Sequence, residues 1–193
     1  LRGLAAKPAL VITDSQAVRE VAAAVPEDIR LTTFSTLFAR YKGDFAAQLA
    51  GAAAIDTLKD GDRVLIAEGC SHHVTCDDIG RVKIPNWMKK YTGRELKFEW
   101  TQGADFPDNL EDYALVVHCG GCMLNRAEVR RRINECARQG VKVTNYGIVI
   151  SKMQGVLERV VKGIADAGAT GSVSATGSIS DTGSISDTGE EGD

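Results

Sequence analysis

Two short clusters of potential metal ligands contain all three histidines and three of the five cysteines of this 193-residue sequence. The first cluster is Cys70-Ser71-His72-His73, and the second is His118-Cys119-Gly120-Gly121-Cys122. Thiolates and imidazoles bind zinc, and thiolates hold iron–sulfur clusters. Their concentration in two places therefore predicts a metal or redox site.

Cys119 and Cys122 are three residues apart at the start of a predicted helix. Both sulfurs can therefore face one point, beside the free N–H groups of the first helical turn, which favours thiolate over thiol. Gly120 and Gly121 have no Cβ, so the backbone could approach inorganic sulfide and donate hydrogen bonds to it. The pair of glycines indicates a bound group larger than one metal ion.

The residue types alone leave three kinds of site open. An iron–sulfur cluster is usually held by four thiolates, so three cysteines would leave one position to another side chain. The candidates for that position are His72, His118, Asp77 and Asp78. A thioredoxin-like dithiol enzyme would use the C-x-x-C pair alone and would not need the first cluster. Structural zinc has four places, and more potential ligands than four are present.

Other cysteines and the arginine run are assigned to packing or to solvent. Cys136 shares a helix face with Val129 and Ile133, so we expect it in the core. Cys76 is a loop thiol near the site that is not expected to be a direct ligand. The run 130–132 is expected to form a solvated helix face.

The rest of the chain alternates between short apolar strands and helices. Strands are predicted at residues 9–13, 29–34, 63–68, 95–100, 113–118 and 141–145. Helices are predicted at residues 16–24, 36–41, 45–58, 85–92, 126–139 and 147–164. This alternation predicts an α/β fold with a mostly parallel sheet, divided into two small units. Ligands in such folds bind at the carboxyl ends of strands, and both ligand clusters directly follow a strand.

The composition, 44% hydrophobic and 25% charged, is that of an ordinary soluble domain. The net charge of −3 arises from an acidic C-terminal end, and the remainder is only weakly basic, so neither nucleic acid nor a membrane surface is expected as a partner. The sequence shows no signal peptide, no apolar run of membrane-spanning length and no P-loop. Five cysteines without a dense disulfide framework indicate a reducing, cytoplasmic location.

A six-residue repeat occupies the C-terminal end of the chain. Residues 172–189 read SVSATG, SISDTG and SISDTG. Such segments bury too little apolar surface to offset the entropy lost on ordering. Residues 168–193 are therefore predicted to form a low-complexity, disordered tail.

The ligand motif and its flanks together resemble the HydF family, the maturation GTPases of FeFe hydrogenases. Cys70-x-His72 is followed, after 45 intervening residues, by His118-Cys119-x-x-Cys122, which is similar to that family's signature. The stretches PALVITDSQ, FARYKGD, DDIGRVKIPNW, HCGGCMLNR and VTNYG also resemble the family. The likeness covers most of residues 7–160.

This resemblance implies that Cys70, Cys119 and Cys122 hold a 4Fe-4S cluster whose fourth position is exchangeable and not a cysteine. His72 and His118 match the histidines of the motif and are further candidate metal ligands. The implied role is a scaffold or carrier with no catalytic residues of its own. It would take up the diiron subcluster built by radical-SAM maturases and deliver it to the FeFe hydrogenase apoprotein.

The family's architecture also implies how the chain is divided. Residues 1–58 would be part of a dimerisation domain, and residues 59–167 would be the iron–sulfur cluster-binding domain. The full-length protein is expected to form a homodimer. GTP would bind only in an N-terminal domain that this chain lacks, so we expect no enzyme activity here. Because the chain opens at Leu1, inside an apparent element, we also expect its natural N-terminus to be missing.

Overall fold

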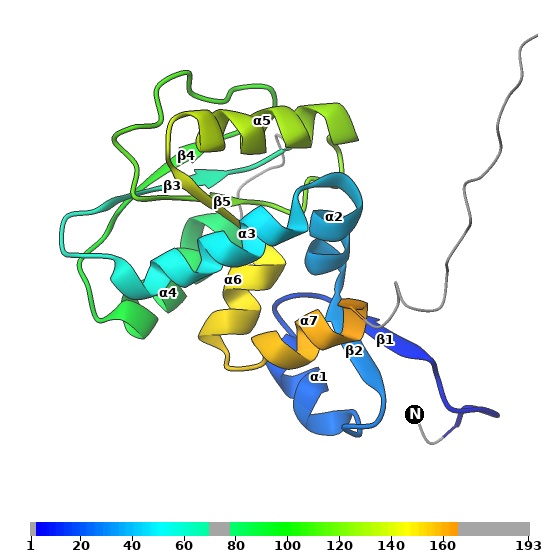
Figure 1. Ribbon diagram of the computed structural model, residues 1–193. Helices are drawn as coiled ribbons and strands as arrows, with labels where there is room; N and C mark the ends of the chain where they lie inside the picture. Colours follow the sequence, from blue (N-terminus) through cyan, green and yellow to red (C-terminus); the bar gives the residue numbers. More distant parts are fainter. Residues whose placement is uncertain (1–2, 70–77, 166–193) are drawn as a thin grey trace, which may run out of the picture.

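The computed structural model describes residues 3–69 and 78–165, which form two parallel sheets linked by helices (Figure 1). The smaller sheet has the order β1-β2 and the larger one β4-β3-β5-β6, and the neighbouring strands are parallel in both sheets. This arrangement confirms the α/β prediction. The strands are β1 Leu10–Thr13, β2 Arg30–Thr33, β3 Arg63–Ala67, β4 Lys97–Thr101, β5 Leu115–His118 and β6 Lys142–Asn145.

Helices make most of the connections between these strands. The α-helices are α1 Val18–Ala24, α2 Phe34–Lys42, α3 Phe45–Ala52, α4 Ile84–Thr92, α5 Arg126–Arg138, α6 Tyr146–Met153 and α7 Leu157–Ala165. A short 3-10 turn, η1 (Ala53–Thr57), continues α3, and a π-helical turn, η2 (Ile79–Lys83), leads into α4.

Side-chain caps fix where several helices begin. Thr33, Asp44, Asn125 and Asn145 each accept a hydrogen bond from a backbone N–H in the first turn of the helix that follows. At the other end of α4, Gly93 adopts the left-handed conformation that stops a helix. Because Thr33 and Asn145 are also the last residues of β2 and β6, α2 and α6 begin exactly where their strands end.

The predicted helix at residues 147–164 is in fact two helices. Gly155, with a φ of 75°, forms a left-handed turn between α6 and α7. The turn lets α6 pack against the larger sheet, whereas α7 packs on β2 of the smaller sheet. One continuous helix could not contact both sheets in this way.

Helices cover both faces of the larger sheet. On one face, Val64 and Val117 pack with Met88 of α4 and Val149 of α6. On the other face, apolar side chains of β3, β5 and β6 pack against α5 through residues such as Ile133. Burial on both faces explains why these strands are continuous apolar runs.

Two predictions concern the chain as a whole. The predicted disordered tail at 168–193 lies outside the described residues, which end with α7 at Ala165. Within the described ranges, no helix has the length and apolar character that crossing a bilayer requires.

Replacing Gly51 by alanine is expected to destabilise the protein, although alanine is the better helix former by about 1 kcal/mol. Helix α3 crosses β6 so closely that a Cβ on Gly51 would lie 1.9 Å from the carbonyl oxygen of Val143. Relieving this overlap requires a backbone shift, and overpacking of this kind costs about 1–3 kcal/mol. Urea denaturation followed by circular dichroism measures the free energy of unfolding.

Ala50→Gly, at an exposed position of the same helix, is the matched control, and it should lose about 1 kcal/mol through helix propensity alone. A Gly51→Ala protein that is as stable as the wild type would contradict the close packing of α3 on β6.

Candidate functional site

The carboxyl ends of β3 and β5 lie side by side at the centre of the larger sheet. Ala67 pairs with His118, and the backbone N–H of Cys119 donates to the Ala67 carbonyl over 2.8 Å. After β3 the chain runs through α4 to β4 on one side, and after β5 it runs through α5 to β6 on the other. Because the connections that follow β3 and β5 run to opposite sides of the sheet, a crevice opens between them, and parallel α/β folds use such crevices to bind ligands.

The sulfur of Cys119 lies in this crevice and accepts two backbone hydrogen bonds. Gly69 N–H donates to it over 3.0 Å and Gly121 N–H over 3.3 Å. Backbone donors of this kind stabilise a thiolate. A Cβ on Gly69 would lie 2.8 Å from Cγ of Leu124, so only glycine allows the two segments to approach this closely.

Gly121 gives the C-x-x-C loop its turn. Its φ of 63° is left-handed, and a Cβ there would lie 3.1 Å from a methyl group of Val129. The structure directs the N–H of Gly121 to the sulfur of Cys119. Donation from these glycines to inorganic sulfide stays a prediction.

Residues that follow five of the six strands line one cavity of about 280 Å³. Asp14 follows β1, Phe34 follows β2, Glu68 follows β3, Cys119 follows β5 and Tyr146 follows β6. Both sheets therefore point their carboxyl ends at the same space, and segments from distant parts of the sequence meet there. The other lining residues are Ser15, Gln16, Ser35, Phe38, Ile79, Gly120, Gly121 and Cys122.

The described residues also form larger hollows, of about 690 Å³ and 620 Å³, elsewhere on the protein. Neither is lined by a cysteine or a histidine among the described residues. The smaller cavity is therefore the candidate site, because it brings the predicted thiol ligands Cys119 and Cys122 together.

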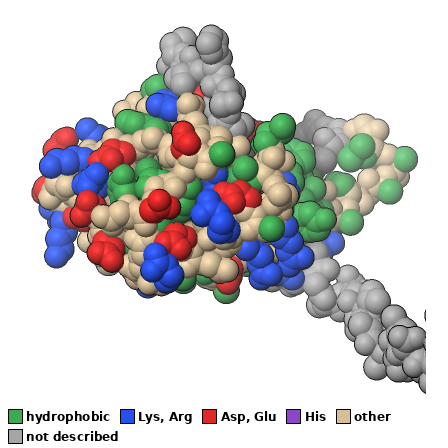
Figure 2. Space-filling model, turned by 90° about the horizontal axis from the view of Figure 1, so that it is seen from above, with side chains coloured by type: hydrophobic (Ala, Val, Ile, Leu, Met, Phe, Trp, Pro, Cys, Tyr) green, Lys and Arg blue, Asp and Glu red, His purple; other side chains and the backbone are tan. Residues whose placement is uncertain are grey.

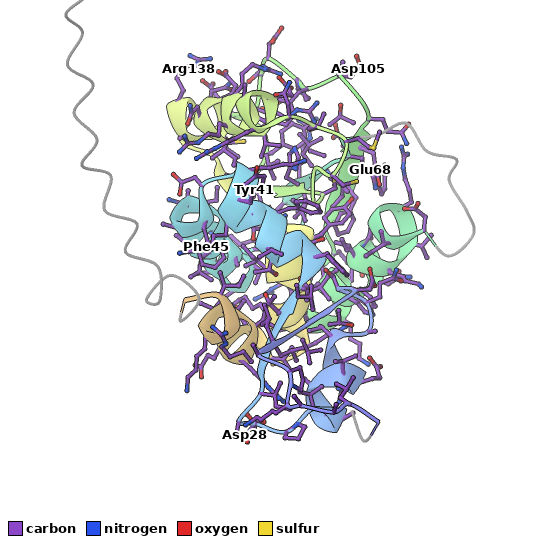
Figure 3. All side chains as sticks on the ribbon, turned by 90° about the vertical axis from the view of Figure 1, so that its right-hand side faces the viewer. Asp28, Tyr41, Phe45, Glu68, Asp105 and Arg138 are labelled. Carbon is purple, nitrogen blue, oxygen red and sulfur yellow. The ribbon has the colours of Figure 1, made fainter. Side chains whose placement is uncertain are left out.

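A buried carboxylate, Glu68, borders the cavity at the end of β3 (Figure 3). The hydroxyl of Tyr146 donates to one of its oxygens over 3.4 Å, and the side-chain amide of Gln102 donates to the other over 3.3 Å. Burial, together with the charge of Glu68, holds the pKa of Tyr146 well above its usual value, so this hydroxyl keeps its proton. Arg81 lies 3.7 Å from the carboxylate and balances its charge.

His118 is fully buried, and it is not among the residues that line the cavity. Its ring Nδ1–H donates to the carbonyl of Cys119 over 2.8 Å, which restrains the first residue of the cysteine loop. Burial, with a smaller contribution from Arg132, lowers the pKa of His118 to about 4, which leaves the ring neutral at pH 7. Its Nε2 has no hydrogen-bond partner among the described residues. A role for His118 as a metal ligand stays a prediction.

Cys70 and His72, the other predicted ligands, lie outside the described residues, as does Cys76. Of the predicted set, the structure places Cys119 and Cys122 at one cavity, with Cys122 exposed at its surface. Across residues 3–69 and 78–165, no three histidine, cysteine, aspartate or glutamate side chains are close enough to form a metal site. The complete ligand set therefore stays a prediction.

The core position predicted for Cys136 is confirmed, because its side chain is fully buried and burial raises the pKa of its thiol to about 12. The prediction that Arg132 faces solvent is wrong. Its guanidinium is buried, donates to Glu128 over 2.8 Å and to the Gly103 carbonyl over 2.5 Å, and stacks on the Phe106 ring. It thereby ties α5 to the loop after β4.

The outer surface around α5 carries interspersed basic and acidic side chains (Figure 2). Arg131 and Arg138 form i,i+3 ion pairs there with Glu128 and Glu135. The solvated helix face expected for the arginine run is thus correct for Arg131, whose partner Glu128 also holds the buried Arg132.

Several cavity residues were not predicted from the sequence. Asp14 and Tyr146 directly follow predicted strands, and Phe34 and Glu68 directly follow strands in the structure. The rule that ligands bind at carboxyl ends of strands would have found these residues if applied to every strand, not only to the two that precede cysteines.

Comparison with protein families gives two matches that together cover most of the chain. A family model described as hydrogen maturase F tetramerization domain matches residues 46–163, and one described as hydrogen maturase F dimerization domain matches residues 1–43. A comparison with curated proteins gives no match. The domain boundaries proposed above, at residues 58 and 167, stay predictions.

Replacing Glu128 by glutamine is expected to lower the free energy of unfolding at pH 7 by about 1.5–3 kcal/mol, the range for hydrogen bonds to charged groups. Hydrogen bonds from Arg131 and then Arg132 lower the pKa of Glu128 to about 2. Because the folded-state pKa lies below the ordinary value of 4.5, the stabilisation is complete above that pH and is lost as the pH falls toward 2. Urea titrations between pH 7 and pH 2 measure the difference.

Glu135→Gln removes an exposed ion pair of the same helix and serves as the control, with a smaller expected loss at pH 7. A difference between wild type and Glu128→Gln that does not shrink below pH 4.5 would contradict the role given to this carboxylate.

Proposed function

Because the chain belongs to the hydrogen maturase F family, we propose that the cavity at Cys119 and Cys122 holds a 4Fe-4S cluster, with Cys70 as its third thiolate ligand. Family membership places the chain in hydrogenase maturation. Within that process, the proposed role is a scaffold that carries the diiron subcluster of FeFe hydrogenase.

One contact carries this proposal more than any other. The N–H of Gly69, the residue that directly precedes Cys70, lies 3.0 Å from the sulfur of Cys119. Gly69 and Cys119, which are 50 residues apart in sequence, therefore meet at one sulfur. A dithiol enzyme would need no such meeting, whereas a shared cluster does.

The chemistry of the cavity fits a cluster. Backbone N–H groups already point at the sulfur of Cys119, and hydrogen bonds to sulfur stabilise the charge of an iron–sulfur cluster. Phe34, Phe38 and Ile79 supply the apolar part of the lining, with Phe34 itself exposed at the surface. As the family resemblance implies, the fourth position is proposed to belong to a ligand other than cysteine.

An open fourth position suits a carrier better than an enzyme. A carrier needs a site at which a second group can bind and leave, and it needs no general acid or base. The radical-SAM maturases would supply the diiron subcluster, and the FeFe hydrogenase apoprotein would receive it. The two matching family models are described as dimerization and tetramerization domains, which supports the assembly of several copies of the chain.

Anaerobic reconstitution with iron and sulfide tests the proposal. The wild-type protein should bind about four irons per chain and give the visible absorption and the EPR signal of a reducible 4Fe-4S cluster. Cys70→Ser and Cys122→Ser should each lose the chromophore, because each removes one of three thiolate ligands. Cys136→Ala is the matched thiol control and should keep a full cluster, since the Cys136 side chain is in the core.

Metal analysis of the protein as isolated separates the alternatives. One zinc per chain with no binding of iron and sulfide would indicate a structural zinc site. A Cys70→Ser protein that retains a full cluster would exclude Cys70 as a ligand. Disulfide reductase activity that depends on Cys119 and Cys122 but survives Cys70→Ser would favour a dithiol enzyme.

A further inference from the structure

Lys42 is the last residue of α2 and is not part of the predicted ligand motif, but its side chain hydrogen-bonds to the C-x-x-C loop. Its ammonium donates to the carbonyl oxygens of Gly121, Cys122 and Leu124 over 3.0, 3.1 and 2.8 Å. An ammonium has three N–H donors, and each has an acceptor here. The ammonium also lies 4.9 Å from the ring centre of Phe38, which lines the cavity.

These contacts restrain the loop on two sides, at the sulfur of Cys119 and at Lys42. The N–H of Gly121 points to the sulfur of Cys119, while the carbonyl of the same residue points to Lys42. The N–H of Leu124 donates to the Gly121 carbonyl and closes the turn. Lys42 therefore restrains the peptide units that directly follow the Gly121 N–H, and with them the turn that carries this donor toward the sulfur.

Lys42 also connects two parts of the chain that belong to different family models. It lies within residues 1–43, which match the dimerization domain, whereas the loop lies within residues 46–163, which match the tetramerization domain. Helix α2 also supplies Phe34 and Phe38 to the cavity wall. The helix that encloses the cavity is therefore the same helix that holds the cysteine loop.

We propose that Lys42 is a positioning residue of the cluster site: its ammonium holds the C-x-x-C loop in its binding geometry, and its charge raises the reduction potential of the bound cluster. The proposal rests on the cluster-binding function proposed above. A reduced cluster carries one more negative charge than an oxidised one, so a fixed cation beside the loop favours the reduced state. Hydrogen bonds to sulfur, which the loop geometry maintains, act in the same direction.

The first test needs no cluster. Amide hydrogen exchange of the apoprotein should be at least about tenfold faster at Gly121 and Leu124 in Lys42→Met, because the loop has lost its three outer hydrogen bonds. Exchange in β3 and β6 should stay as in the wild type, which would show that the fold is intact. Lys97→Met, at an exposed position of β4 on the far edge of the sheet, is the matched control.

The second test is a redox titration of the reconstituted proteins followed by EPR. Lys42→Met should have a more negative midpoint potential than the wild type, whereas Lys42→Arg, which keeps the charge, should stay close to it. Lys42→Gln keeps donor groups without the charge, and it provides the neutral variant if Lys42→Met does not fold. Lys97→Met should match the wild type.

Faster exchange in the loop together with a more negative potential in the neutral variants supports the proposal. An unchanged exchange rate at Gly121 and Leu124, or an unchanged midpoint potential, overturns the proposal. It requires Lys42 both to hold the loop and to raise the potential of the cluster. If the wild type binds no cluster, the proposed function fails, while the exchange experiment still decides whether Lys42 holds the loop.

Discussion

The parallel pairing of β3 with β5 is the contact on which the site depends. Its register sets Ala67 opposite His118, so the chain leaves both strands at the same level and Gly69 meets the sulfur of Cys119. A shift of one residue would turn the side chains of one strand to the opposite face of the sheet. Gly69 and the sulfur of Cys119 would then no longer meet. The geometry of the sulfur site is therefore a property of strand register and not of the loops alone.

The surroundings of the sulfur combine apolar side chains with fixed polar groups. Aromatic and aliphatic side chains from α2 and η2 line one side, and backbone N–H groups supply the polar contacts on the other. The buried Glu68 is held by Tyr146, Gln102 and Arg81 so that it is not left as an unpaired charge. Apolar surroundings strengthen each of these electrostatic contacts, because there is little water to screen them.

The strand pattern and the C-x-x-C spacing were enough to predict an α/β fold with thiols at strand ends, since both signals are local. The order of the strands was not predictable, because it depends on packing between distant segments. Arg132 illustrates the same limit: a run of three arginines indicates solvent, but one of them is buried by Phe106 and Gly103 from a different part of the chain. The break at Gly155 was missed because the apolar pattern continues across it.

Asp14 and Phe34 of the cavity wall directly follow the strands of a two-stranded sheet, which is too small to be stable by itself. Helix α7 covers β2 so closely that Gly163 leaves no room for a side chain against the backbone of Leu31. Helix α7, near the end of the described residues, thus packs on and supports β2, near their start. The crevice that bears the thiols therefore depends on cooperation between distant segments. Shortening the chain at the α6–α7 turn would disrupt a wall that lies more than 120 residues earlier in the sequence, while every cysteine stays in place.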